Sequence, residues 1–254
     1  MAAVSAFNAL AIPGLHDAPT IDDLRESSNM YNQLPHAETQ LQIPKQHLQH
    51  ILAMIQRHGV EQLFGIHLIH RHDQIGEDML RVEAILRTRQ GSWTKPCAIG
   101  HLDAHNIHGH VFKLLSDERF IAYEYCEGSP PTSLASANSF FFRELANYLL
   151  ENKLTDLIGL EVLHEDQPQR MVEFEMHGGA TVVLSEPEAN YGSLDRATGW
   201  TQRGNDGLAD GDPEPGTHWA KTTNGKHKVF VDGVEPKDEE ELVATLIAEG
   251  VLKV

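Results

Sequence analysis

Residues 171–184, MVEFEMHGGATVVL, are the stretch that decides the predicted fold. The apolar residues of MVEFEM alternate with Glu173 and Glu175, which is the two-residue period of a β-strand with one buried face. The pair Gly178-Gly179 then supplies the positive φ angles of a tight turn, and TVVL returns the chain. The pattern predicts a β-hairpin, and we interpret its two glutamates as a solvent-exposed outer face.

Similar patterns on both sides of this hairpin predict further strands and three amphipathic helices. HWAKTTNGKHKVFVD, with Asn224-Gly225 as its turn, indicates a second hairpin. Because the strands come mainly as hairpins with helices between them, we expect an α+β fold with a mostly antiparallel sheet. The other strands are expected at 64–70, 79–86, 110–116, 119–127 and 157–163, and the helices at 44–58, 139–152 and 237–249.

The chain is expected to form one main domain. We interpret residues 1–43 as an N-terminal arm and residues 44–254 as a single α+β domain. Residues 90–109 contain several turn formers and are expected to be loop-like. The segment 186–217 is rich in Gly, Asp and Pro, so we expect a long loop there, and a loop of this length is usually either functional or disordered. We find no internal repeat in the sequence.

Composition excludes several classes of protein. The 254 residues carry 37 acidic against 20 basic side chains, a net charge of -17 that repels nucleic acid. The two cysteines, Cys97 and Cys126, are too few for a disulfide framework, and we interpret both as small buried residues. With neither a signal-peptide pattern nor a long apolar run, we expect a cytoplasmic protein with no membrane partner. The oligomeric state stays open, with a homodimer among the alternatives.

Histidine is the densest chemical feature of the chain. Seven of its 16 histidines fall within the windows 67–72 and 101–110, and each window contains a His-x-His pair. Alternate residues of a strand share a face, so each pair can present two imidazoles to one ion. Imidazole suits Zn, Fe and Cu, and a carboxylate commonly completes such a site. The candidate metal ligands are therefore His67, His70, His72, Glu77, His101, His105, His108 and His110.

One of these runs resembles a known family. His70-Arg-His72 followed by Glu77 resembles the first metal motif of the cupin family, and PCAIGHLDAHN at 96–106 loosely resembles the second. The resemblance implies that His70, His72, Glu77 and either His101 or His105 bind a metal. The spacing of the second run departs from the family pattern, and the later glycine of the first motif is missing.

The leading hypothesis is a metal-dependent enzyme, of oxygenase or lyase/hydrolase type, that acts on a small organic molecule. Its candidate catalytic residues are His70, His110 and Glu77, and Trp200 and Arg203 are candidate substrate contacts in the long loop. Two alternatives stay open. One is a metal-free histidine acid/base enzyme, such as an isomerase, cyclase or hydrolase. The other is a non-catalytic binding or interaction protein with structural histidines.

Overall fold

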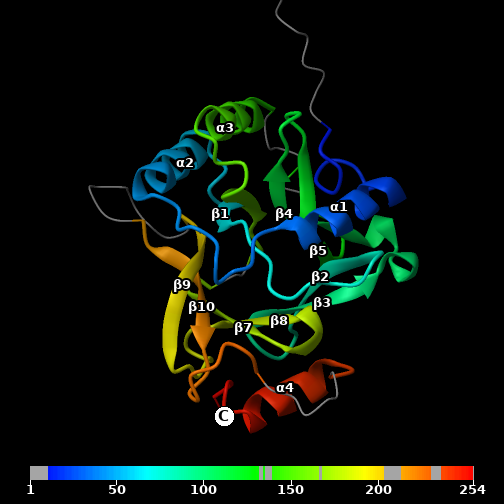
Figure 1. Cartoon of the computed structure of the whole chain (residues 1–254), viewed down its shortest axis with the longest axis vertical. Coiled ribbons are helices and arrows are strands. Elements are labelled where there is room, and N and C mark those ends of the chain that lie inside the picture. Colours follow the sequence, from blue (N-terminus) through cyan, green and yellow to red (C-terminus); the bar gives the residue numbers. More distant parts are fainter. Residues whose placement is uncertain are drawn as a thin grey trace, which may run out of the picture.

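A computed structural model of the chain describes residues 11–131, 134, 139–165, 168–202, 213–229 and 236–253. Within these residues the fold contains four α-helices and ten strands (Figure 1). The helices are α1 (Ile21–Gln33), α2 (Lys45–Arg57), α3 (Ser139–Glu151) and α4 (Glu239–Ala248). The strands are β1 (Phe64–Leu68), β2 (Met79–Ile85), β3 (Gly91–Ala98), β4 (Ile107–Leu114), β5 (Phe120–Glu127), β6 (Ile158–Val162), β7 (Met171–Glu175), β8 (Thr181–Ser185), β9 (Ser193–Trp200) and β10 (Pro215–Lys221).

The strands close into one mixed barrel. Their order is β1-β6-β4-β5-β2-β3-β8-β7-β10-β9, and β9 pairs again with β1. β2 runs parallel to β5 and β7 runs parallel to β10, whereas the other neighbours are antiparallel. The expectation of an α+β fold with an open, mostly antiparallel sheet is therefore wrong. The hairpin at 171–184 does form, but pairing between strands far apart in sequence, such as β1 with β6, joins the strands into a barrel. The second predicted hairpin is not found among the described residues: β10 pairs with β9 and β7, and residues 226–229, directly after the turn at Asn224-Gly225, form only an isolated bridge.

The barrel consists of two halves with the same topology, a repeat that our sequence analysis did not find. Each half is a helix followed by five strands: α2 with β1–β5, and α3 with β6–β10. In each half the second and third strands pair, the fourth and fifth pair, and the second lies parallel to the fifth. Between the halves, the two first strands pair with each other (β1 with β6), and so do the two third strands (β3 with β8). The first strand of each half also pairs with the fourth strand of the other half: β1 with β9, and β6 with β4. Corresponding strands are thus related by an approximate two-fold axis.

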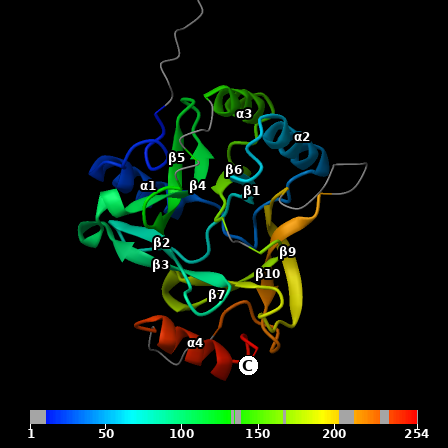
Figure 2. The same ribbon diagram turned by 180° about the vertical axis from the view of Figure 1, so that it is seen from behind.

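The helices lie outside the barrel. In both views α2 and α3 lie side by side at one end, and α4 lies at the opposite end beside β7 and β8 (Figures 1 and 2). The helices predicted at 44–58, 139–152 and 237–249 are confirmed within a few residues at each end. Helix α1 was not predicted; a capping box between Thr20 and Asp23 starts it, and it packs against β5 and β2. No helix within the described residues is long and apolar enough to cross a membrane.

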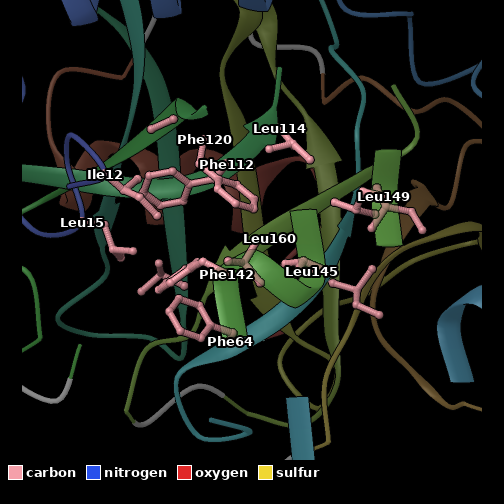
Figure 3. Close-up of a cluster of buried hydrophobic side chains, with 14 of the residues drawn as sticks. Ile12, Leu15, Phe64, Phe112, Leu114, Phe120, Phe142, Leu145, Leu149 and Leu160 are labelled. Carbon is pink, nitrogen blue, oxygen red and sulfur yellow. The ribbon is translucent and has the colours of Figure 1, made fainter. Parts of the chain in front are cut away.

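Apolar side chains of the strands point outward, toward the helices. Phe64 of β1, Phe112 of β4 and Leu160 of β6 pack against Phe142 and Leu145 of α3 (Figure 3). A second apolar cluster joins the outer faces of β7 and β8 to α4. Because side chains alternate along a strand, the opposite, largely polar set faces the inside of the barrel. This arrangement gives the fold a polar interior.

The hairpin at 171–184 is confirmed as β7 and β8, with positive φ angles at Gly178 and Gly179. Its glutamates are not solvent-exposed as expected, because their face lines the barrel interior. Residues 91–98, expected to be loop-like, form β3, and residues 193–200 within the expected long loop form β9. The division into an arm over 1–43 and one domain over 44–254 stays a prediction.

Candidate metal centre

The interior of the barrel contains a cavity of about 460 Å³. Residues from both halves line it, and several of them have ionisable side chains. Arg81 balances part of the negative charge, because its buried guanidinium donates to Glu124 over 2.9 Å and to Thr181 over 2.8 Å. The ionisable lining residues are His67, Glu83, Arg89, His110, Glu124, Glu161, His164, Glu165 and Glu173.

At one side of this interior, His70, His72 and Glu173 form a buried group with the spacing of a metal site. The two Nε2 atoms of His70 and His72 lie 3.3 Å apart, and His72 Nε2 lies 2.9 Å from Glu173 Oε1. Ligand atoms about 2.0–2.1 Å from a tetrahedral Zn²⁺ are about 3.3–3.4 Å from one another. The His70–His72 separation therefore already fits a shared ion, and the His72–Glu173 contact needs only a small opening.

The far nitrogens of both imidazoles are held by other groups. His70 Nδ1 lies 2.6 Å from the carbonyl oxygen of Leu68, so this nitrogen must carry the proton and donate. His72 Nδ1 likewise donates to Glu175 Oε1 over 2.9 Å. Metal-binding histidines are commonly oriented in this way by a carbonyl or a carboxylate. Tyr31 of α1 accepts a hydrogen bond from the backbone N–H of His72 and holds the segment after β1 in place.

Burial and neighbouring charge set the protonation of this group. Burial, and then the charge of His72, hold the pKa of His70 well below its usual value, so His70 is neutral with a free Nε2 lone pair. Burial also opposes charge on His72, but Glu173 and Glu175 outweigh it and raise the pKa of His72 to about 9. The same pairing lowers the pKa of Glu173 against the effect of its own burial. Without metal, His72 is therefore an imidazolium between two carboxylates.

A second group, Glu83, Cys126 and His164, lies at another part of the interior. His164 Nε2 and His110 Nδ1 both lie 3.0 Å from Glu83 Oε2. Burial and the carboxylate of Glu83 raise the pKa of the Cys126 thiol, so it is protonated without metal. This group has the nitrogen, oxygen and sulfur donors that a transition metal accepts.

A chain of imidazoles and carboxylates joins the two groups across the cavity. The rings of His70 and His67 stack with their centroids 5.2 Å apart. His67 Nδ1 lies 3.9 Å from Glu161 Oε2, and Glu161 Oε1 lies 3.8 Å from His110 Nε2. Both histidine windows therefore contribute side chains to one cavity, although His70 and His110 belong to different groups.

Comparisons of the chain with family models, with curated proteins and with solved structures found no match.

The sequence-predicted residues divide into three sets. His67 and His110 line the cavity, and His70 and His72 form a buried group with the cavity residue Glu173. Glu77, His101 and His105 are exposed and belong to neither group. His108 is buried on β4, where Nδ1 faces the carbonyl oxygen of Gly128 at 2.9 Å.

Of the two predicted substrate contacts, the structure describes only Trp200, which is not among the residues that line the cavity. Trp200 is buried at the end of β9, where it pairs with Ile66 of β1 and joins the apolar cluster under α2 and α3. Arg203 lies outside the described residues.

Sequence reasoning missed several residues of the site. Three of them are the buried carboxylates Glu83, Glu161 and Glu173. Their side chains lie inside only because the strands close into a barrel, which no local pattern predicts. One signal was available, however: LFGIHLIH at 63–70 and LIGLEVLH at 157–164 share a pattern. Aligning them places His164 at the position of His70 and Glu161 at the position of His67, which marks both as candidates.

Proposed function

We propose that the barrel is a metal-dependent enzyme that binds a divalent transition metal ion through His70, His72 and Glu173. The observation that carries this proposal is the facing pair of Nε2 atoms, 3.3 Å apart, with both Nδ1 atoms already engaged. Two imidazoles and one carboxylate are the protein ligands of many catalytic sites for Zn and non-haem Fe. Such a set leaves coordination positions for water and substrate.

The adjoining cavity supports a small organic molecule as the substrate. Its volume of about 460 Å³ lies within the usual range for small-molecule sites. The metal would polarise a substrate oxygen or activate water or dioxygen. The cavity is lined by carboxylates, so we expect a substrate that is neutral or cationic rather than one with several negative charges.

We propose that Glu161 is the general base of this cavity. It is 6% exposed and belongs to neither group of potential ligands, and its neighbour His67 stacks on the ring of His70. Its oxygens approach His67 Nδ1 and His110 Nε2 at 3.9 and 3.8 Å, beyond normal hydrogen-bonding distance. A carboxylate with such loose contacts is available to take a proton from a bound substrate or water.

Metal content and turnover test the two parts of the proposal separately. Protein purified without a histidine tag is stripped with a chelator, reloaded with Zn²⁺, Fe²⁺ or Co²⁺, and incubated with a panel of small neutral or cationic esters, amides and amino alcohols. The Fe²⁺ sample is also incubated in air to detect oxygenation. We expect turnover by loaded protein alone, loss of metal and turnover in Glu173→Gln, and loss of turnover with retained metal in Glu161→Gln.

His105→Gln serves as the matched control, because it removes an exposed histidine from the second window. It should keep both metal and turnover. Turnover that survives metal removal would contradict the proposal and favour the metal-free acid/base alternative. Metal binding without turnover of any compound, by the wild type with each of the three metals, would favour a binding protein.

A further inference from the structure

The approximate two-fold axis relates the second group to the first. His70 lies two residues after β1, and His164 lies two residues after β6. The axis passes beside the Ile66–Leu160 pair, because these residues are register partners and occupy corresponding positions of the two halves. A Cβ on Gly65 would meet the carbonyl oxygen of Trp200 at 2.9 Å, and one on Gly159 would meet that of Phe112 at 3.0 Å. The two halves therefore also share close backbone contacts.

The same relation extends to the carboxylates and their neighbours. In the parallel pairs, Glu83 of β2 is the partner of Cys126, and Glu173 of β7 is the partner of Trp219. Glu83 thus occupies the position of Glu173, and Cys126 that of Trp219. Each group takes its histidine from one half and its carboxylate from the other: His70 with Glu173, and His164 with Glu83.

His110 is an independent observation that points to a ligand at the second group. It is 8% exposed and lines the cavity, yet neither ring nitrogen makes a hydrogen bond of good geometry. Its Nδ1 nevertheless lies 3.0 Å from Glu83 Oε2, and its ring centroid lies 5.2 Å from that of His164. Glu83 gives Nδ1 of His110 a charge partner, but Nε2 lies 3.8 Å from Glu161 Oε1. A buried nitrogen without a hydrogen bond is costly unless another group satisfies it.

We infer that the group Glu83, Cys126 and His164 is a second transition-metal site, with His110 as an additional nitrogen ligand, so that the barrel binds two ions per chain. The inference rests on the proposed function, because the first site supplies the template for the second. The two sites differ in chemistry: the first offers two nitrogens and an oxygen, and the second adds a thiolate. Thiolate favours Zn²⁺ and Co²⁺ over Mg²⁺ or Ca²⁺, and binding displaces the thiol proton to solvent.

Cobalt titration distinguishes the two sites, because a thiolate ligand gives Co²⁺ an intense near-ultraviolet charge-transfer absorption that nitrogen and oxygen ligands do not give. Metal-free protein, kept reduced, is titrated with Co²⁺ while absorption and bound cobalt are measured. We expect two cobalt ions per chain and the sulfur absorption. Cys126→Ser should abolish that absorption, whereas Cys97→Ser, the matched control, should retain it.

The variants also separate failure of this inference from failure of the proposed function. If His164→Gln and Cys126→Ser each bind one ion fewer, and His70→Gln loses the other ion but keeps the sulfur absorption, both sites are supported. One ion without sulfur absorption, lost in His70→Gln, overturns the second site and leaves the first. If instead the protein binds one ion with sulfur absorption, and His70→Gln changes neither, the first site is overturned. Circular dichroism of each metal-free variant verifies that it folds.

Discussion

The Nε2 atoms of His70 and His72 face each other at 3.3 Å inside the barrel, while their Nδ1 atoms donate to Leu68 and Glu175. Two imidazoles in this orientation need a shared proton or a shared ion between their inner nitrogens. In the metal-free chain, the carboxylate of Glu173 also contacts the inner nitrogen of His72, Nε2.

Glu173→Gln should weaken binding of Zn²⁺ by at least about 100-fold, because the amide replaces the anionic ligand of the site. Competition with a chromophoric chelator measures the dissociation constant. Glu77→Gln is the matched control, since Glu77 is exposed and lies in neither group. Equal affinities of wild type and Glu173→Gln would remove Glu173 from the site.

Glu175→Gln should weaken Zn²⁺ binding by about 10- to 100-fold, although Glu175 is not itself a proposed ligand. Its carboxylate orients His72 by accepting from Nδ1 and increases the basicity of the ring. The same competition assay applies. Glu127→Gln, which changes an exposed glutamate at the end of β5, should leave the affinity unchanged. If the two variants bind equally well, the proposed role of Glu175 is refuted.

Stability of the metal-free protein should fall as pH rises from 6.5 to about 9. Burial disfavours charge on His72 and His110, but the carboxylates of Glu173 and Glu83 outweigh it and raise both pKa values to about 9. A raised histidine pKa stabilises the fold fully below the unfolded value of about 6.5, and this stabilisation is lost as pH rises through the folded value.

Metal reverses the sign of this dependence. Because an ion displaces the proton of His72, binding should tighten over the same pH range, and the loaded protein should gain stability relative to the metal-free form. Urea unfolding at pH 6.5, 7.5, 8.5 and 9.5, with chelator or with Zn²⁺, measures both trends. Parallel pH profiles with and without metal would show that no proton is displaced.

Phe142→Ala should lower the free energy of unfolding by about 3–5 kcal/mol, because it leaves a cavity in the apolar cluster between α3 and the barrel. Phe140→Ala, on the same helix, is the matched control: Phe140 is 64% exposed, so its loss should cost under about 1 kcal/mol. Urea unfolding compares the two. Similar losses in both variants would contradict the packing of α3 on the strands.

Local structure was more predictable from the sequence than the closure of the barrel. Three helices and the 171–184 hairpin follow from apolar periods and turn glycines, which depend on neighbouring residues. Pairing of Ile66 with Leu160 joins distant segments, and no local period specifies it. Glu173 and Glu175 illustrate the consequence. The alternation of residues places them on the strand face opposite the apolar one, but only closure of the barrel turns that face inward.

The candidate site was predictable to a similar extent. Composition and His-x-His spacing indicated His70 and His72, because both belong to one short segment. Their carboxylate partner, Glu173, lies about a hundred residues away, and β7 brings it there through the barrel. Glu77 was expected to be the carboxylate ligand because it is close to His72 along the chain, but the turn after Asp73 leaves it exposed.

Anomalous diffraction at the zinc absorption edge, from crystals grown with Zn²⁺, tests the central claim most directly. We predict a peak between His70 Nε2, His72 Nε2 and the Glu173 carboxylate, about 2.0–2.1 Å from each nitrogen, with Nδ1 of His72 still donating to Glu175. Zinc found elsewhere, with His72 Nε2 still bound to Glu173 and no peak between the two imidazoles, would contradict it.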